Sequence, residues 1–315
     1  MGRKYAMLYT LSLNPCLDKT ASILRFDPDA PNRVTVERLD VGGKGVNVAR
    51  AVNALEGDVK LIGFDYRGQP VATAMAREKV PCILIPLAGE LRVNMKLKEE
   101  ETGRTLEISE RGLETSREDI RRIIFRLLDC VQPGDWVALA GSLPPGAAPE
   151  TYAKILRALK EKGCRTAVDC DGPALTAALK EKPSLIKPNA QEFACLTGVN
   201  AKDTAAAANA CRKLLNEGVE WVCLSRGALG ALLAHADGVW TCPAAPVSVK
   251  GTAGAGDTML AALMLATERQ MPPEDALRFA VAASGASVMR PGTLLCRKED
   301  AEKLFTELKS EIIAI

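Results

Sequence analysis

The sequence predicts an α/β fold, in which a mostly parallel sheet has helices on both faces. Three observations support this prediction. Short β-rich runs alternate with amphipathic stretches along most of the 315 residues, polar or glycine-rich turns follow several of these runs, and two alternating segments interrupt the pattern. Alternation of strand and helix is typical of parallel sheets. No repeat or flexible linker divides the chain, so we expect a single domain over residues 1–315.

The expected elements follow from apolar periodicity and from the turns between them. Strands are predicted at 7–13, 59–64, 82–86, 136–140, 166–169, 185–187 and 221–225. Helices are predicted between the later strands and at 46–55, 71–79, 117–128, 150–162, 258–267, 274–289 and 298–312.

Two segments alternate with a period of two instead. In residues 92–98, Val93, Met95 and Leu97 are separated by polar residues, and 33–39 shows the same alternation. A turn at 99–103 then leads into 105–109. This pattern indicates strands of a sheet that has one face exposed to solvent. We therefore predict a small β-sheet lid, with its strands within 10–40 and 91–110 and its polar face over the site; a solvated edge hairpin is the alternative.

Charge and composition argue against several classes of partner. The 41 basic and 39 acidic residues give a net charge of +2 without a long run of one sign, so neither nucleic acid nor a membrane surface is an expected partner. Aromatic residues, at 4%, are too sparse for a base-stacking platform. No stretch approaches the roughly 20 apolar residues of a membrane span, and no signal-peptide pattern is present. We expect a soluble, cytoplasmic protein.

The cysteines and the single histidine do not indicate a metal site. Ten cysteines stand singly without a CxxC pair, mostly within apolar segments, as small buried hydrophobic residues do in a reducing compartment. His235 lies where a predicted strand runs into a turn, so neither a zinc site nor a Ser-His-Asp arrangement is expected.

The most informative motif is Gly254-Ala255-Gly256-Asp257, which runs directly into an apolar, helix-favouring stretch. The first turn of a helix presents unpaired N–H groups that bind phosphate, and glycines let the backbone approach it closely. A carboxylate at Asp257, beside such an anion hole, suits removal of a proton from a hydroxyl that attacks a phosphoryl group. An ordinary helix N-cap is the alternative interpretation.

Further turns of this kind follow other predicted strands, where parallel α/β sheets bind their ligands. They lie at 14–18, 42–47, 141–146, 187–192 and 225–230. Lys44 is not a P-loop lysine, because the GxxxxGK[ST] spacing is absent. A dinucleotide-binding dehydrogenase is excluded, because Gly254-x-Gly256 is followed by Met259 where the third glycine is required.

These motifs resemble the ribokinase-like carbohydrate kinases, the PfkB family, over nearly the whole chain. The most specific matches are residues 43–49 and 254–257. Within the family the sequence is most similar to the 1-phosphofructokinase group, through residues 13–18, 42–50, 92–97, 141–146 and 187–189. The tagatose-6-phosphate kinases are the next most similar group.

The resemblance implies a role for each motif. Asp257 would be the catalytic base, and Gly254, Ala255 and Gly256 would hold the transferring phosphoryl group. The residues implied to bind the sugar are Asp18, Gly42, Gly43, Lys44, Asn47, Arg92, Asn94 and Lys96. Those implied to bind ATP are Lys187, Asn189, Ser225, Gly227 and Gly230, with Asn189 and Glu192 placing Mg²⁺ through water. A homodimer through the lid strands is also implied.

The expected substrate follows from cations in the lid. Arg92, Asn94 and Lys96 lie at every second residue and therefore share one face of the strand. Lys44 lies on the glycine turn that the lid should cover, so an anion is expected between these cations. We therefore expect ATP-dependent phosphorylation of fructose 1-phosphate at its 6-hydroxyl, giving fructose 1,6-bisphosphate. A tagatose-6-phosphate kinase and a catalytically silent binding protein of the same fold are the alternatives.

Overall fold

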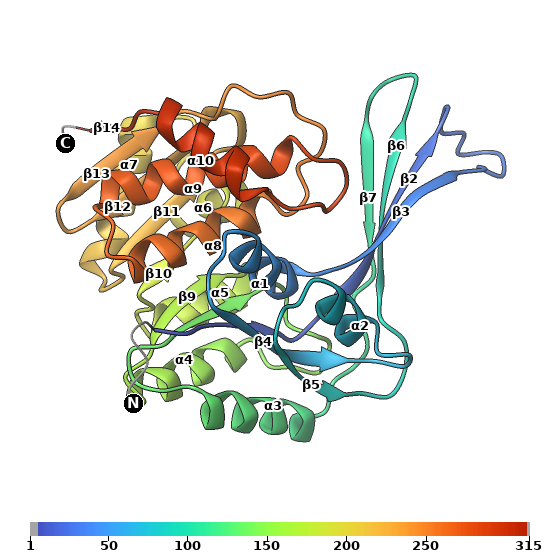
Figure 1. Cartoon of the computed structure of the whole chain (residues 1–315), viewed down its shortest axis with the longest axis horizontal. Coiled ribbons are helices and arrows are strands. Elements are labelled where there is room, and N and C mark those ends of the chain that lie inside the picture. Colours follow the sequence, from blue (N-terminus) through green and yellow to red (C-terminus); the bar gives the residue numbers. More distant parts are fainter. Residues whose placement is uncertain (1–5, 314–315) are drawn as a thin grey trace.

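The computed structural model describes residues 6–313 and shows a large sheet, its covering helices and a small separate sheet (Figure 1). Within these residues the large sheet has ten strands in the order β14-β13-β12-β11-β10-β9-β8-β1-β4-β5. Their bounds are β1 Leu8–Ser12, β4 Val59–Asp65, β5 Cys82–Pro86, β8 Trp136–Ala140, β9 Arg165–Asp169, β10 Leu185–Ile186, β11 Trp221–Ser225, β12 Ala231–His235, β13 Gly238–Cys242 and β14 Glu311–Ile312. All neighbours are parallel from β5 to β11, and β12, β13 and β14 add an antiparallel edge.

Helices cover both faces, as the alternating sequence pattern predicts. Their bounds are α1 Lys44–Ala54, α2 Pro70–Arg77, α3 Arg117–Cys130, α4 Thr151–Glu161, α5 Gly172–Leu179, α6 Ala190–Thr197, α7 Thr204–Asn216, α8 Ala255–Glu268, α9 Pro273–Val288 and α10 Lys298–Glu307. α1 packs on α8 and on β1, while α3 and α4 contact β4 and β9 (Figure 1). Among the described helices none is long and apolar enough to cross a bilayer.

The core explains why the site-forming elements keep fixed positions. Every residue of β1 and of β8 is buried, because a parallel strand in the middle of a sheet is covered on both faces. In α8 the run Met259–Leu265 is buried on all sides, as expected of a helix that is apolar all round. The amino end of α8 is therefore held rigidly at the carboxyl edge of the sheet.

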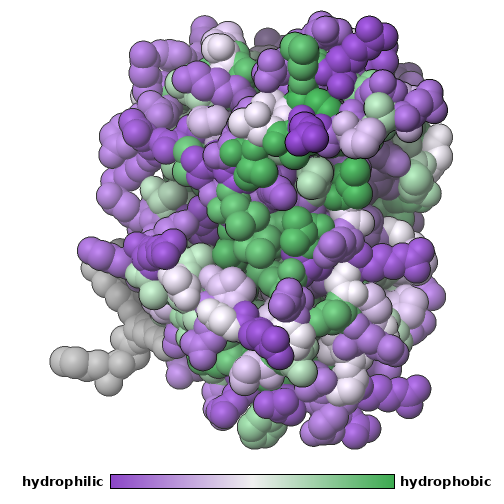
Figure 2. All heavy atoms as spheres, turned by 90° about the vertical axis from the view of Figure 1, so that its right-hand side faces the viewer, coloured by the Kyte–Doolittle hydropathy of each residue, from purple (hydrophilic) through white to green (hydrophobic). Residues whose placement is uncertain are grey.

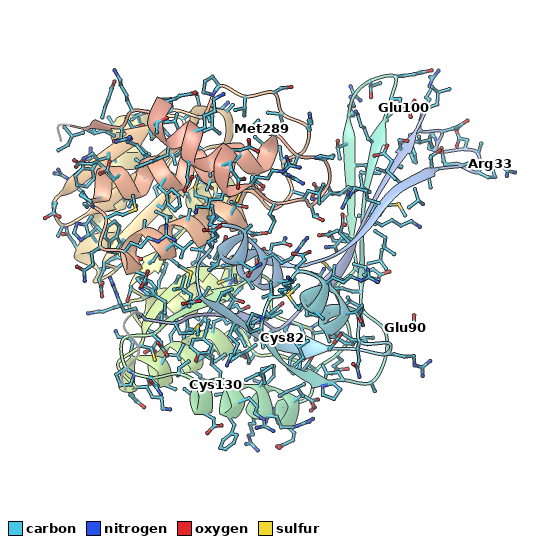
Figure 3. All side chains as sticks on the ribbon, in the orientation of Figure 1. Arg33, Cys82, Glu90, Glu100, Cys130 and Met289 are labelled. Carbon is cyan, nitrogen blue, oxygen red and sulfur yellow. The ribbon has the colours of Figure 1, made fainter. Side chains whose placement is uncertain are left out.

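The small sheet is the predicted lid, and in the described residues it has four strands in the order β3-β2-β6-β7. Their bounds are β2 Cys16–Ile23, β3 Thr35–Gly42, β6 Val93–Glu99 and β7 Thr105–Ser109. The sheet projects from the body of the molecule, with Arg33 and Glu100 near the outer ends of its two hairpins (Figures 1 and 3).

Cross-strand register divides the lid into two faces. Asp18 pairs with Asn94, and Asn94 pairs with Ser109, so these polar residues share one face. Lys19, Met95 and Ile108 form the adjacent row and therefore point to the other side. The polar face belongs to the site, as the period of two predicts.

Two details differ from the expectations. The expected turn at 14–18 leads directly into lid strand β2, where the apolar row of Leu17, Ala21 and Ile23 is interrupted by a lysine. The last helix ends at Glu307 rather than at 312: Leu308 has extended backbone angles and is buried, and Ile312 pairs with Trp240 in β13. Sheet pairing at the edge thus replaces the last expected helical turn.

Candidate active site

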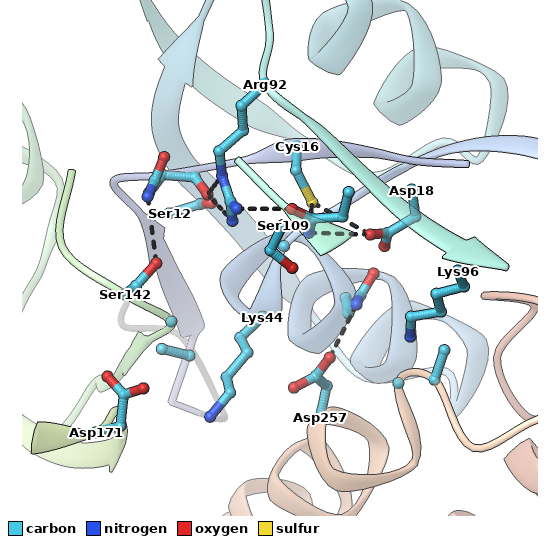
Figure 4. Close-up of a pocket in the computed structure, with 18 residues that line it drawn as sticks. Ser12, Cys16, Asp18, Lys44, Arg92, Lys96, Ser109, Ser142, Asp171 and Asp257 are labelled. Carbon is cyan, nitrogen blue, oxygen red and sulfur yellow. Dashed lines mark hydrogen bonds between the residues drawn. The ribbon is translucent and has the colours of Figure 1, made fainter. Parts of the chain in front are cut away.

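A cavity of about 310 Å³ lies between the lid and the carboxyl ends of the central strands (Figure 4). Most of the expected sugar-binding and catalytic residues line it: Asp18, Gly43, Lys44, Asn47, Arg92, Asn94, Lys96, Gly254 and Asp257. The structure thus brings the first third of the chain and the start of α8 to one place.

Asp257 lies in the first turn of α8 and faces this cavity. Its side chain accepts a hydrogen bond from Asn47, whose Nδ2 lies 2.8 Å from Asp257 Oδ2. Burial, followed by the nearby charge of Asp169, raises the pKa of Asp257 to about 6, against the lowering effects of Lys44, Asn47 and Lys187. A carboxylate with such a pKa is ionised near neutral pH and is more basic than an ordinary aspartate.

The backbone before Asp257 forms the amino-terminal end of α8, as expected. Gly254 caps α8 with φ 75°, a left-handed conformation that favours glycine, and the helix begins at Ala255. The N–H groups of Gly256 and Asp257 have no carbonyl one turn earlier in the helix. Lys187 Nζ lies 3.3 Å from the position that a Cβ on Gly256 would occupy. A cation and helix N–H groups therefore meet at one point, as an anion site requires.

Asp169, at the end of β9, is a site residue that the sequence analysis missed. Its side chain is 1% exposed, and its oxygens lie 2.7 Å from Lys44 Nζ and 2.9 Å from Lys187 Nζ. Burial opposes ionisation, but Lys187 and Lys44 outweigh it and hold the pKa of Asp169 below its usual range. An aspartate as the last residue of an otherwise buried, apolar strand was the available signal.

Lys44 lines the cavity, but its ammonium group binds two carboxylates. Its ammonium group contacts Asp169 and, at 3.3 Å, Glu192 Oε1, whereas Arg92 and Lys96 enter the cavity from the lid (Figure 4). Although burial opposes protonation, Asp169 and Glu192 raise the pKa of Lys44 above its ordinary value. In this structure Lys44 thus binds Asp169 and Glu192 and does not form a cation group with Arg92 and Lys96.

Asn189 and Glu192 form a capping box at the start of α6. Asn189 Oδ1 accepts from the N–H of Glu192 at 2.9 Å, and Glu192 Oε2 accepts from the N–H of Asn189 at 2.8 Å. The second carboxylate oxygen of Glu192 faces Lys44, which also binds Asp169. Lys44 thus pairs with both carboxylates, and among the described residues no group of three or more metal-ligating side chains is present. We therefore expect any magnesium ion near Glu192 to be held through water.

The expected nucleotide-binding residues lie along the same sheet edge but do not line this cavity. Asn189 pairs with Ser225 in an isolated parallel bridge, which joins the ends of neighbouring strands β10 and β11. Gly227 begins a short 3₁₀ turn with φ 57°. At Gly230 a Cβ would lie 2.0 Å from the carbonyl oxygen of Cys242, so only glycine fits there.

Arg92 is held by neutral oxygens. It donates to the backbone carbonyl of Asn14 at 3.0 Å, to the carbonyl of Glu110 at 2.9 Å and to Asn94 Oδ1 at 2.9 Å. The guanidinium is thus fixed in the cavity while its positive charge is not neutralised by these acceptors. Asn14, which also donates to Ser142 Oγ at 3.2 Å, was not among the expected site residues.

Gly42 and Asn47 make contacts within the chain that the sequence analysis did not predict. A Cβ on Gly42 would lie 2.1 Å from Asp18 Oδ2, so the glycine makes room for that carboxylate. Asn47 uses its amide nitrogen to hold Asp257. His235 lies away from this cavity, where it contacts Asp237 at 2.9 Å and stacks on Trp221.

Comparison with known proteins agrees with this geometry. Residues 9–300 match the pfkB family carbohydrate kinases. The chain belongs to this family. The family match and the phosphofructokinase relatives show that the chain is an ATP-dependent sugar kinase.

Among the family's curated members, 1-phosphofructokinase from Bacillus subtilis (strain 168) is 31% identical over 305 residues, covering 96% of this chain and 99% of that protein. D-tagatose-1-phosphate kinase from Klebsiella oxytoca is 29% identical over 284 residues, or 90% and 92% of the two chains. The structure of phosphofructokinase-2 from Escherichia coli with substrates and products has a TM-score of 0.91 and 29% identity, covering 96% of this chain and 99% of that one.

Proposed function

We propose that the protein transfers the γ-phosphoryl group of ATP to the 6-hydroxyl of fructose 1-phosphate, giving fructose 1,6-bisphosphate. The observation that carries this proposal is Arg92, a fixed guanidinium inside the cavity whose hydrogen bonds go to neutral oxygens. Lys96 lines the same cavity, and its nearest acid, Glu107, is 3.7 Å away. A substrate phosphate would receive charge-assisted hydrogen bonds from both cations. The relative from Bacillus subtilis is a 1-phosphofructokinase.

In the proposed mechanism Asp257 accepts the proton of the 6-hydroxyl as its oxygen attacks the phosphoryl group. Asn47 orients the carboxylate by its bond to Oδ2, and burial gives the base a pKa of about 6. The N–H groups at the start of α8 and the ammonium of Lys187 stabilise the charge on the transferring group. Bound Mg²⁺ would supply further neutralisation of the nucleotide's phosphates near Glu192.

An assay panel with Mg-ATP tests the acceptor: fructose 1-phosphate, fructose 6-phosphate, the two tagatose phosphates and free fructose. Arg92→Ala should lower kcat/KM for fructose 1-phosphate by about 10- to 150-fold, the range for a hydrogen bond to a charged group. The residual rate with fructose should change little, because that sugar has no phosphate for the arginine. Lys98→Ala is the matched control, since Lys98 is exposed on the same strand.

The outcomes separate the alternatives. Equal losses with fructose 1-phosphate and fructose would mean that Arg92 only supports the lid. Better use of tagatose 6-phosphate would support the alternative activity given in the sequence analysis. Better use of tagatose 1-phosphate would instead agree with the name of the relative from Klebsiella oxytoca, a D-tagatose-1-phosphate kinase. Absence of turnover with every sugar phosphate would leave a binding protein of this fold.

We also propose that two copies associate through the outer face of the lid. Large apolar side chains are exposed there, among them Val36 at 49%, Leu39 at 59% and Ile108 at 54%. The surface that faces the viewer in Figure 2 shows apolar residues gathered across its middle. Exposed apolar groups of this kind are typical of an interaction surface. Phosphofructokinase-2 from Escherichia coli has a tetrameric inhibited form.

Light scattering after size-exclusion chromatography tests this association. The parent protein should have the mass of a dimer, and Ile108→Asp should convert it to a monomer. Phe125→Asp is the matched control, because Phe125 is 68% exposed on α3, outside the lid. A monomeric parent protein would contradict the lid interface. So would an Ile108→Asp variant that remains a dimer while Phe125→Asp becomes a monomer.

A further inference from the structure

Cys16 is buried in the lid wall of the active-site cavity and takes no part in the proposed chemistry. It is the first residue of β2, its side chain is 1% exposed, and it lines the cavity with Asp18 and Asn94. Its sulfur lies 3.4 Å from Asp18 Oδ1 and 3.2 Å from Asn94 Nδ2. Burial, followed by the charge of Asp18, raises the pKa of Cys16, so the group is a neutral thiol.

The direction of these hydrogen bonds follows from the chemistry of the three groups. A carboxylate only accepts, so the thiol donates its proton to Asp18 Oδ1. The amide nitrogen of Asn94 only donates, so it gives hydrogen bonds to the sulfur and, at 3.2 Å, to Asp18 Oδ1. Cys16 thus accepts one hydrogen bond and donates another, and the three side chains form a triangle of hydrogen bonds.

The carboxylate of Asp18 is confined from its other side as well. Its Oδ2 occupies the space that a Cβ on Gly42 would need, 2.1 Å from that position. Two donors hold Oδ1 while the Gly42 backbone accommodates Oδ2, and Figure 4 shows the Asp18 side chain directed from the lid into the cavity. A single orientation of the carboxylate results.

The triangle is connected to the cation that the proposed function assigns to the substrate phosphate. Asn94 Oδ1 accepts from Arg92 Nη1 at 2.9 Å, while the amide nitrogen of the same side chain serves Cys16 and Asp18. An interaction that orients Asn94 therefore acts on a cation and a carboxylate in the same cavity.

We infer that Cys16 is a positioning residue of the acceptor site: its thiol, between Asn94 and Asp18, fixes the carboxylate that accepts hydrogen bonds from the sugar hydroxyls. This inference rests on the proposed function for the identity of the ligand. The thiol does not touch the reacting atoms, and its effect on the sugar passes through Asp18.

Kinetics of three cysteine variants test the inference. Cys16→Ala removes the donor and should raise KM for the sugar phosphate about three- to tenfold, as for loss of one hydrogen bond from a weak donor. Both kcat and KM for ATP should stay within about twofold. Cys16→Ser restores a donor and should return KM to within about twofold of the parent. Cys211→Ala, which removes a buried thiol from α7, is the matched control and should leave KM unchanged.

A double-mutant cycle shows whether the thiol acts through Asp18. In an Asp18→Asn background, Cys16→Ala should change KM by less than about twofold, because the carboxylate it positions is gone. An equal fold-change in both backgrounds would overturn the inference, as would a parallel rise of KM for ATP.

Crystal structures of the unliganded variants separate this inference from the proposed function. Asp18 should occupy more than one rotamer in Cys16→Ala and a single one in Cys16→Ser. A single, unchanged Asp18 rotamer in Cys16→Ala would overturn the positioning role, whatever sugar the protein uses. If fructose 1-phosphate is not a substrate, the proposed function fails while these structures still decide the role of Cys16.

Discussion

Replacing Asp257 by asparagine should remove activity and stabilise the fold at the same time. Burial and the charge of Asp169 raise the pKa of this carboxyl from its ordinary value of 3.8 to about 6. The folded state therefore binds the proton more tightly than the unfolded chain does. Ionised Asp257 destabilises the folded protein, and this cost is complete above pH 6 and disappears as the pH falls below 4.

The size of the effect follows from that pKa. Since each pH unit corresponds to about 1.4 kcal/mol, a rise of about 2 makes the charge cost on the order of 3 kcal/mol at pH 8. Asparagine keeps the shape and has no charge, so the variant should gain on the order of 1–3 kcal/mol, the lower figure allowing for its amide protons. For 315 residues, 3 kcal/mol corresponds to a Tm increase of about 4–5 °C.

Urea unfolding at pH 8 and pH 4 measures the difference in free energy of unfolding between Asp257→Asn and the parent protein. The kcat of the variant, measured separately, should fall by about 10²- to 10⁴-fold. Asp129→Asn is the matched control, since that carboxyl is exposed on α3 and its loss should change stability by less than about 0.5 kcal/mol. Equal stability changes at both pH values would refute the reasoning, because the gain would then be unrelated to ionisation. Retention of more than a tenth of kcat, with chemistry rate-limiting, would leave Asp257 as a helix cap.

Two further variants test the charges around this base. Asp169→Asn leaves Lys44 and Lys187 without their buried partner and should cost about 3–5 kcal/mol of stability. Because the Asp169 charge raises the pKa of Asp257, the acid limb of the pH–kcat profile should also move to lower pH. An acid limb that stays in place would contradict that coupling. Glu192→Gln should raise the Mg²⁺ concentration for half-maximal rate by about tenfold while leaving KM for the sugar nearly constant, and an unchanged magnesium requirement would restrict Glu192 to capping α6.

The sequence predicted the elements whose cause is local. The parallel strands and their helices follow from apolar periodicity, and the start of α8 follows from Gly254 and the apolar stretch after Asp257. The lid was predicted because β6 alternates regularly. In β2 a lysine interrupts the apolar row of Leu17, Ala21 and Ile23, so its alternation is weaker.

What remained hidden depends on contacts between distant segments. Lys44 was assigned to the sugar phosphate, and its contacts with Asp169 and Glu192 join residues 125 and 148 positions apart. The bond from Asn47 to Asp257 spans 210 positions. Gly42 appears in the sequence as part of an anion-binding turn, and only the assembled lid shows that it leaves space for Asp18. Partner choice among charged side chains is set by the fold and not by local spacing.

The lid enters the chain in two separate pieces. Strands β2 and β3 lie between β1 and α1, β6 and β7 lie between β5 and α3, and each piece leaves and rejoins the body at neighbouring points (Figure 1). Asp257, Lys187 and the turns along β10 and β11 belong to the later half of the sequence. If the lid binds the acceptor as proposed, natural variation in residues 14–42 and 91–112 would change acceptor preference with little effect on phosphoryl transfer. The same two segments mark the natural boundaries for grafting a lid between related kinases.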